Sequence, residues 1–291
     1  TIVSFGLIKK LELIDIISRS SYGFLNGIFC GVLTIGSLPI WENGFKIVTP
    51  LKLLELSNPN QPLLKRLLLE APGTYHHSIV VGNLSERAAE AVGADPLLAR
   101  VGSYYHDIGK LSRPYFFKEN QLGLDNPHDK LQPSMSTLII TNHVKDGIAL
   151  GKKHRIPEEI IDIIAEHHGD TAVMFFYHKA KQQEDGIEVK VEDFRYPGPK
   201  PQTKEAAIVM LADSTEAAVR SIKEPSKKNI EEMIRNIIKG KLDDGQLDEC
   251  DLTLRDLNTI ANAFSATVMG IFHERIEYPD LELEKNRGET N

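Results

Sequence analysis

Residues 20–41 constrain this chain most, because they form 22 consecutive residues without a charged side chain. As an α-helix, a stretch of this length crosses the hydrocarbon core of a membrane, which is about 30 Å thick. Its glycine, serine and asparagine content is typical of one helix within a bundle. We therefore predict a transmembrane helix over about 20–41, inside a membrane region that covers 1–42. A buried helix of a soluble protein is the alternative.

The start and the composition of the chain limit its class. The first of the 291 residues is Thr1 and not Met, so we expect a piece of a longer protein, with 1–8 as the end of a preceding membrane helix. Basic residues flank the uncharged stretch on both sides and leave its orientation open. The net charge of -7 without a strongly basic block argues against a duplex nucleic-acid partner. Cys30 and Cys250 form no CxxC pair and fit a reducing compartment.

Beyond residue 42 the sequence carries mainly helical signals. Residues 43–72 contain proline-broken apolar segments and indicate a connector. A helical domain is predicted from 73 to 278, with a polar loop insertion at 184–202 and a frayed charged tail at 279–291. Alternation typical of strands is nearly absent, apart from 187–191. The predicted fold class is all-α.

Caps and prolines mark where the helices begin. Thr74 is a candidate N-cap of a helix that runs to about Val92, and Asp95-Pro96 is a cap followed by a first-turn proline. Pro133 opens a long helix to about Lys153, and Pro157 opens one that leads into His167-His168. Further helices are predicted at 171–183, 204–223, 227–239 and 254–277.

His106 and Asp107 are adjacent and are followed by Gly109 and Lys110. Successive side chains on a helix point about 100° apart, so the pair cannot share one face of a regular helix. The two side chains converge if the helix ends there, and Gly109 is a plausible end. Imidazole and carboxylate together are ligands of zinc, iron or manganese, and an aspartate can bridge two cations.

Further histidines and an aspartate occur in helical segments with apolar faces. Asp213 lies in an apolar helical run, where an ionised carboxylate needs a cation, a metal or a hydrogen-bond network. Taken singly, each such residue is more often an ordinary core or surface residue. Five histidines and two aspartates on separate helices nevertheless indicate a metal site: His77, His106, Asp107, His143, His167, His168 and Asp213.

This ordered series resembles the HD-domain metal-dependent phosphohydrolases, whose helical bundle binds metal through the pattern H…HD…H…HH…D. It is most similar to the membrane-bound HD phosphodiesterases of the seven-transmembrane HD receptor type, which hydrolyse cyclic di-AMP. The resemblance runs from about 20 to 275 and rests on residues 58–78, 106–121, 126–147, 164–180 and 195–218. It implies a bacterial cell-membrane protein whose catalytic domain follows the last membrane helix on the cytoplasmic side.

The resemblance also assigns roles to individual residues. It implies a first metal bound by His77, His106, Asp107 and Asp213, with Asp107 bridging to a second metal bound by His143, His167 and His168. His77 is chosen over His76 because it directly precedes Ser78. Lys110 is implied as a catalytic and phosphate-contacting residue. Arg113 and Asn120, in the loop that follows, are candidate substrate contacts.

The residues after the histidine pair bear on the choice of substrate. A related branch that cleaves cyclic di-GMP follows its His-His with Gly-Tyr-Pro. Here Gly169-Asp170-Thr171 follows instead, and Tyr196-Pro197 lies in a distant loop. This departure favours cyclic di-AMP.

The ligand set predicts two divalent transition-metal ions, iron or manganese rather than magnesium, because most donors are imidazoles. A metal pair about 3.5–4 Å apart clamps a phosphodiester and activates a water. The alternatives are an HD phosphohydrolase acting on (p)ppGpp or a deoxynucleoside triphosphate, and a non-catalytic nucleotide sensor. A homodimer through 254–277 is a further expectation, although the apolar stripe there is equally consistent with a core face.

Overall fold

The computed structural model describes residues 12–45, 47–121, 123, 125–183, 189–222 and 226–273. The predictions for 1–8 and for the tail at 279–291 lie outside these residues. Contacts divide the chain into two compact units, Thr1–Lys52 and Leu53–Asn291. We describe each unit by itself.

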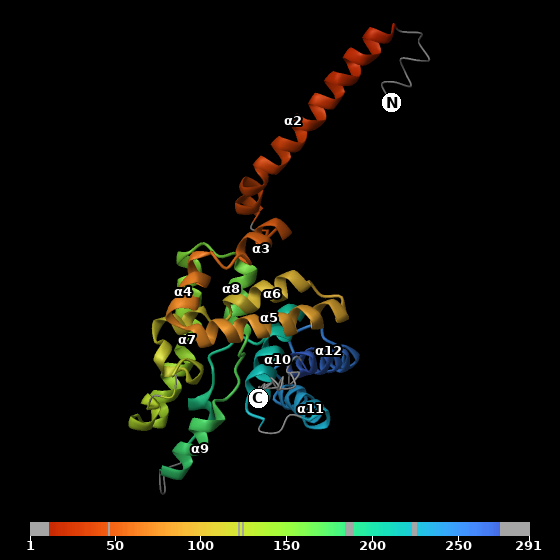
Figure 1. Ribbon diagram of the computed structural model, residues 1–291. Coiled ribbons are helices and arrows are strands. Elements are labelled where there is room, and N and C mark those ends of the chain that lie inside the picture. The colour runs from red at the N-terminus through yellow and green to blue at the C-terminus, as the bar shows by residue number, and fades with distance from the viewer. Residues whose placement is uncertain are drawn as a thin grey trace, which may run out of the picture. The chain divides into compact units, whose positions relative to one another are not determined.

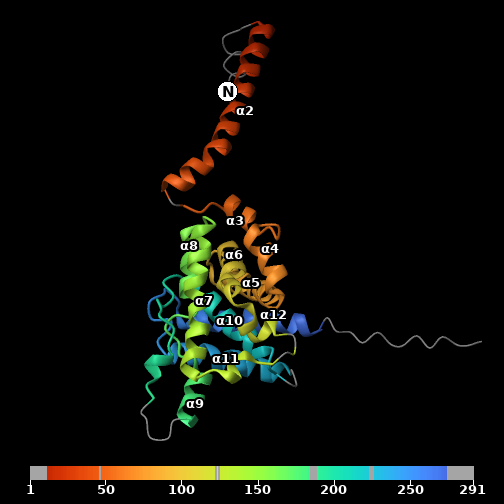
Figure 2. The ribbon, with the colours of Figure 1, turned by 90° about the vertical axis from the view of Figure 1, so that its left-hand side faces the viewer.

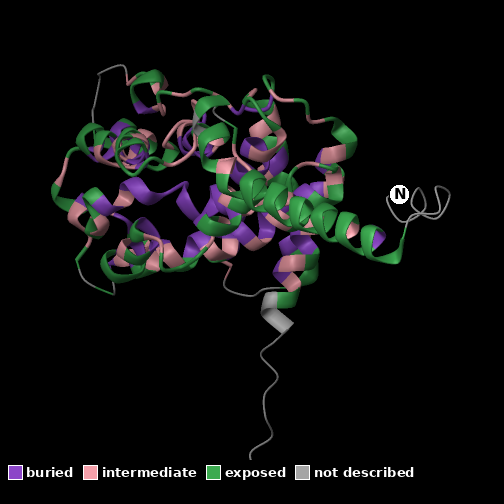
Figure 3. Ribbon diagram, turned by 90° about the horizontal axis from the view of Figure 1, so that it is seen from above, coloured by how far each residue is buried: buried purple, intermediate pink, exposed green. Residues whose placement is uncertain are grey.

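The first unit contains the helix α2, Leu13–Phe45. Leu13–Glu42 is long and apolar enough to cross a membrane, and none of its most apolar window is buried; Figure 3 shows this exposure along the helix. Polar side chains bond within the helix: Thr34 donates to the carbonyl of Cys30, and Ser37 to that of Thr34. Such bonds lower the cost of placing hydroxyl groups in an apolar environment. The predicted span at 20–41 lies inside α2.

The second unit is built from helices (Figure 1). They are α3 (Pro50–Leu56, which begins at the end of the first unit), α4 (Pro62–Glu70), α5 (Pro72–Val92), α6 (Pro96–Tyr105), α7 (Pro133–Lys153), α8 (Glu158–Glu166), α9 (Met174–Gln183), α10 (Lys204–Val219), α11 (Lys227–Asp243) and α12 (Leu254–His273). Short 3₁₀ turns are η1 (Ile108–Ser112), η2 (Pro114–Phe116), η3 (Lys118–Asn120), η4 (Pro127–Lys130) and η5 (Val191–Phe194). The described residues form no strand, only an isolated bridge between Ala172 and Arg195. The all-α prediction is confirmed.

Two predicted helix starts were wrong. Pro72 opens α5 at a position where the missing N–H costs nothing, so the helix begins before Thr74. α9 begins at Met174 rather than at residue 171, because Val173 donates its N–H to the carbonyl of Phe194 beside the isolated bridge. The Asp95 cap is confirmed: its carboxylate accepts the N–H groups of Leu97 and Leu98.

Helix α10 lies at the centre of the second unit. Residues 206–212 are all completely buried, as expected of a helix that is apolar on every side. It packs against α5, α6, α8 and α11, while α5 contacts α6 and α12 (Figures 1 and 2). Residues on α5, α6 and α10 therefore reach a common interior.

Gly109 allows η1 to lie directly on α7. A Cβ at Gly109 would lie 1.8 Å from the carbonyl oxygen of His143 and 2.5 Å from the nitrogen of Gly147. The predicted role of Gly109 in ending the helix is thus secondary, since α6 already ends at Tyr105. The main role of Gly109 is the close approach that places Asp107 beside His143.

We expect Gly109→Ala to lower the free energy of unfolding by about 1–3 kcal/mol or more, because the methyl group must push two backbone segments apart. Chemical denaturation measures this change. Gly240→Ala is the matched control, since a Cβ there meets nothing within 4 Å; we expect it to be neutral or stabilising by about 0.5–1 kcal/mol. Equal stability of the two variants would contradict the packing role.

Candidate metal centre

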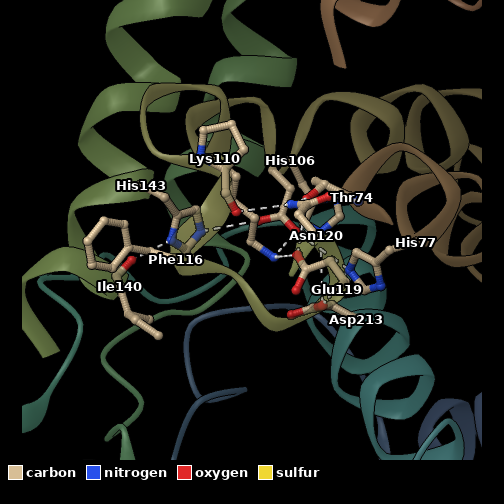
Figure 4. A network of polar contacts seen from close by, with 12 residues as sticks. Thr74, His77, His106, Lys110, Phe116, Glu119, Asn120, Ile140, His143 and Asp213 are labelled. Carbon is tan, nitrogen blue, oxygen red and sulfur yellow. Dashed lines mark hydrogen bonds and ion pairs between the residues drawn. The ribbon is translucent and has the colours of Figure 1, made fainter. Parts of the chain in front are cut away.

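The seven predicted ligands come from five places in the fold and meet in one interior site. His77 lies on α5 and Asp213 on α10, while His143 lies on α7. The remaining four follow the ends of helices: His106 and Asp107 after α6, and His167 and His168 after α8. All are buried except His168, which is partly buried. Figure 4 shows His77 and His143 at opposite ends of the polar network.

The end of α6 brings the adjacent pair together. His106 caps the helix with helical angles, whereas Asp107 leaves them, at φ -107° and ψ 13°. The imidazole Nε2 of His106 then lies 3.2 Å from Asp107 Oδ2. The predicted convergence at a helix end is confirmed.

Two groups of ligand atoms share Asp107. His77, His106 and Asp107 form one group, in which all three atoms lie within 4.8 Å of one another. Asp107, His143, His167 and His168 form the other. The two groups face different oxygens of the shared carboxylate. Oδ2 lies 3.6 Å from His77 Nε2, while Oδ1 lies 3.2 Å from His143 Nε2 and 3.8 Å from His167 Nε2.

Asp213 lies between the same two groups. Its Oδ1 is 3.0 Å from His77 Nε2 and 3.9 Å from His106 Nε2. Its Oδ2 is 3.6 Å from His168 Nδ1. Asp213 thus contacts the first group, as predicted, and also a histidine of the second.

Three of the imidazoles are oriented by their own helical turn. The Nδ1–H groups of His106, His143 and His167 donate to the carbonyls of residues three positions earlier, Ser103, Ile140 and Ile164, at 2.6, 2.6 and 2.9 Å. In its neutral form each of these imidazoles has the free lone pair on Nε2, which faces the centre.

The interior fits metal ions better than a purely hydrogen-bonded network. Three buried atoms make no hydrogen bond with any described residue: His77 Nε2, His106 Nε2 and Asp107 Oδ1. Asp213 lies within ion-pair distance of His77, and His143 within ion-pair distance of Asp107. Such orphaned atoms are costly unless something else binds them. Their mixture of imidazole and carboxylate is a transition-metal donor set.

The ionisation states of Asp107 and His167 agree with this donor set, and that of His77 differs. Burial disfavours the charged form of Asp107, yet the charges of His106 and Lys110 hold its pKa well below the usual range. Burial, together with the neighbouring histidines, lowers the pKa of His167 to about 3. For His77, the cost of burial is outweighed by the carboxylates of Asp213 and Glu216, which raise its pKa to about 10.

Metal loading should therefore release a proton from His77. Below pH 10 the metal-free imidazole carries a proton on Nε2 that a metal must displace, whereas His167 is already neutral. We expect the release of about one proton per chain at neutral pH and an affinity that rises by up to about tenfold per pH unit. Calorimetry with Mn²⁺ in two buffers of different ionisation enthalpy measures the release. Loading without proton release would contradict the protonated His77.

Lys110 is partly buried beside the shared aspartate. Its Nζ lies 2.7 Å from Asp107 Oδ2 and 2.8 Å from Glu119 Oε1, and 5.0 Å from the ring centre of Phe117. Two carboxylates on one ammonium group outweigh the cost of burial and raise the pKa of Lys110 above its usual value. Lys110 is a partly buried cation of the centre, and its role as a phosphate contact stays a prediction.

The two candidate substrate contacts in the following loop differ in their surroundings. Asn120 is bound to the start of α5: its Oδ1 accepts the N–H of Thr74 at 3.2 Å, and its Nδ2 donates to the Thr74 hydroxyl at 2.8 Å. Arg113 is exposed. The contacts of Asn120 thus fix the loop that carries Glu119, and a role for either residue in substrate binding stays a prediction.

Sequence reasoning missed Glu119, Glu216 and Tyr196. Glu216 lies one helical turn after Asp213, so the helical period carried a signal for it. Tyr196 stacks on His168 with ring centres 4.2 Å apart, and its N–H bonds to the carbonyl of Thr171. The loop of Tyr196-Pro197 is thus distant in sequence only. The departure from Gly-Tyr-Pro directly after His168, on which the prediction of cyclic di-AMP rested, is unaffected by this contact.

A cavity of about 420 Å³ reaches the centre from the side of α10. Its lining combines ligand candidates with charged side chains: His77, Lys110, Lys118, Glu119, Asp213, Glu216, Ala217, Arg220 and Ser221. Three of these residues are cations and three are carboxylates.

A helical bundle that gathers two groups of imidazoles around one aspartate belongs to the class of helical metal-binding domains. Comparison with family models specifies the class further. Residues 74–218 match the HD domain, and residues 1–49 match the 7TM receptor with intracellular HD hydrolase. The chain belongs to the HD-domain family.

Two relatives that the chain matches over most of its length bear one name. The cyclic-di-AMP phosphodiesterase PgpH of Bacillus subtilis is 53% identical over 281 residues, which are 96% of this chain and 39% of the relative. Its Listeria monocytogenes namesake is 51% identical over 259 residues, 89% of this chain and 36% of the relative. The chain thus spans less than half of these proteins.

Solved structures agree with these matches. The crystal structure of the L. monocytogenes phosphodiesterase PgpH HD domain is 52% identical, with a TM-score of 0.70, and is covered completely by 74% of this chain. The same domain in complex with cyclic di-AMP is 51% identical, with the same TM-score and coverage. The similarity covers the helical unit that contains the metal centre.

Proposed function

We propose that this chain is the catalytic part of a metal-dependent phosphodiesterase that hydrolyses cyclic di-AMP to linear pApA. Relatives at 53% and 51% identity are cyclic-di-AMP phosphodiesterases, and a similar HD domain has been crystallised with cyclic di-AMP. The proposal extends the activity named for those proteins to a chain that spans less than half of their length.

The observation that carries the proposal is the position of the Asp107 carboxylate. One oxygen faces His106 at 3.2 Å and the other faces His143 at 3.2 Å. A carboxylate that faces two separate imidazole groups suits a pair of ions better than one. His77, His106, Asp107 and Asp213 would hold the first ion, and His143, His167 and His168, with Asp107, the second.

These ligands favour iron or manganese, because imidazole donors suit transition metals and magnesium prefers oxygen donors. When bound, such a pair lowers the pKa of a water and clamps the phosphodiester. The protein contributes the orientation of the Nε2 atoms through the three backbone carbonyls. It also contributes a largely buried interior in which electrostatic interactions are strong.

The cavity supplies contacts for the phosphate groups of the substrate. Lys110 is assigned to the scissile phosphate, because it is a partly buried cation that lines the cavity beside Asp107. Lys118 and Arg220 line the same cavity and present positive charge to an incoming dianion. Asn120 is assigned to substrate binding and also to positioning of the loop. Arg113 is assigned to a substrate contact as well.

The surroundings of the domain are proposed as well. Helix α2 would anchor the chain in the bacterial cell membrane, with the HD domain of 73–278 in the cytoplasm and 43–72 as its connector. The 7TM-type match at 1–49 supports the anchor. The proposed homodimer is tested by measuring the mass of the purified protein particle in detergent.

Turnover of cyclic di-AMP beside cyclic di-GMP tests the function directly. The chain is purified in detergent and loaded with Mn²⁺, and products are separated by chromatography. We expect pApA and much slower turnover of cyclic di-GMP. With two metal ions bound, turnover of (p)ppGpp or a deoxynucleoside triphosphate instead would assign another phosphohydrolase, and no turnover of any substrate would leave a nucleotide sensor.

A further inference from the structure

His77 differs from the other imidazoles in what holds its second nitrogen. His106, His143 and His167 each donate Nδ1–H to a neutral carbonyl of their own helical turn. His77 Nδ1 instead lies 2.6 Å from Glu216 Oε2, a residue 139 positions away on another helix. Among these four histidines, His77 alone is oriented by a carboxylate.

Helix α10 contacts both nitrogens of the His77 ring. Asp213 and Glu216 are three residues apart and so lie on one face of the helix. Asp213 Oδ1 is 3.0 Å from Nε2 on the metal side, and Glu216 Oε2 is 2.6 Å from Nδ1 on the opposite side. The orientation of the ring is therefore fixed by α10 and not by α5, the helix that carries it.

Arg220 completes the arrangement on the surface side. It lies one turn beyond Glu216, and its Nε donates to Glu216 Oε1 at 3.1 Å while Nη2 contacts the same oxygen. Glu216 is buried, whereas 45% of the Arg220 side chain is exposed. An ion pair thus connects a metal-ligand candidate to a cation that lines the cavity.

We propose that Glu216 is a positioning residue that orients His77 and strengthens it as a ligand of the first metal, and that Arg220 holds Glu216 in place. The inference rests on the two-metal site of the proposed function. A carboxylate accepting from Nδ1–H makes the opposite nitrogen a stronger donor, and loss of such partners typically costs about 10–100-fold in metal affinity. The effect is confined to one ion, because the second group has no contact with Glu216.

Metal binding without any substrate tests this assignment. The full chain in detergent is titrated with Mn²⁺ alone, in competition with a chelator. We expect two ions for the unaltered chain. Glu216→Gln should weaken one ion by about 10–100-fold and leave the other unchanged. Glu90→Gln is the matched control, since that carboxylate is 66% exposed and paired with Arg87; it should bind both ions normally.

A purely structural role of Glu216 makes a different prediction: the metal-free chain would melt earlier, and the ratio of the two affinities would not change. Unchanged affinity for both ions, or equal weakening of both, overturns the proposal. Should Glu216→Gln not fold, Arg220→Gln provides the second test, because its side chain is 45% exposed. We expect a smaller loss at the same ion, and unchanged binding overturns the role of Arg220. If the unaltered chain binds fewer than two ions, the two-metal site itself fails.

Discussion

Asp107→Ala is expected to lose both metal ions and all measurable hydrolysis while the helical fold remains. Asp107 is the residue common to both groups of ligand atoms. Its removal takes one oxygen from each metal site at once. The loss of affinity should exceed the roughly 100-fold that removal of a ligand's hydrogen-bond partner costs, since a direct ligand is gone. Metal analysis, turnover of cyclic di-AMP and far-UV circular dichroism measure the three outcomes.

The fold should survive because Asp107 caps no helix and the hydrophobic core is formed by other residues. Lys110 also keeps a partner in Glu119. Asp129→Ala is the control, since the Asp129 side chain is 70% exposed and its ion pair with Lys179 is long, at 3.9 Å. Two bound ions in Asp107→Ala, or retained turnover, would contradict the bridging assignment.

Short-range sequence signals predicted several helix starts and the geometry at the end of α6. The prolines at 96 and 133 stand in the first turns of their helices, as predicted, and the steric problem of adjacent His106 and Asp107 was solved by the end of α6. Thr74 was misread for a physical reason. Its hydroxyl donates to Glu119 instead of capping α5, so a good capping residue serves a contact 45 positions away.

Non-local contacts explain what the sequence did not reveal. Glu119 reaches Lys110 because η3 lies on the start of α5, and no periodic pattern marks such a loop contact. Tyr196 arrives at His168 through the bridge between Ala172 and Arg195. Glu216 was the exception, because its spacing from Asp213 is helical. A search for carboxylates one turn from each predicted ligand finds it.

Lys110→Ala is expected to lower kcat by about 10²–10⁴-fold, the range for loss of a positioned proton donor, while two metal ions remain bound. Lys110 lines the cavity beside Asp107, where it can stabilise a non-bridging oxygen or protonate the leaving ribose oxygen. The histidine and aspartate ligands are untouched, so metal content should not change. KM should change less than kcat, because the ammonium group acts mainly on charge that develops in the transition state.

Stability complicates the single variant, and a double variant resolves this. Removal of Lys110 leaves the carboxylate of Glu119 without the cation that offsets its burial, which costs up to about 3–5 kcal/mol. Lys110→Ala with Glu119→Gln removes both charges and keeps an acceptor for the Thr74 hydroxyl. We expect the double variant to regain stability in denaturation while its kcat stays low. Recovery of turnover together with stability would make Lys110 a structural residue. Loss of metal in either variant would mean that Lys110 is needed for Asp107 to bind metal.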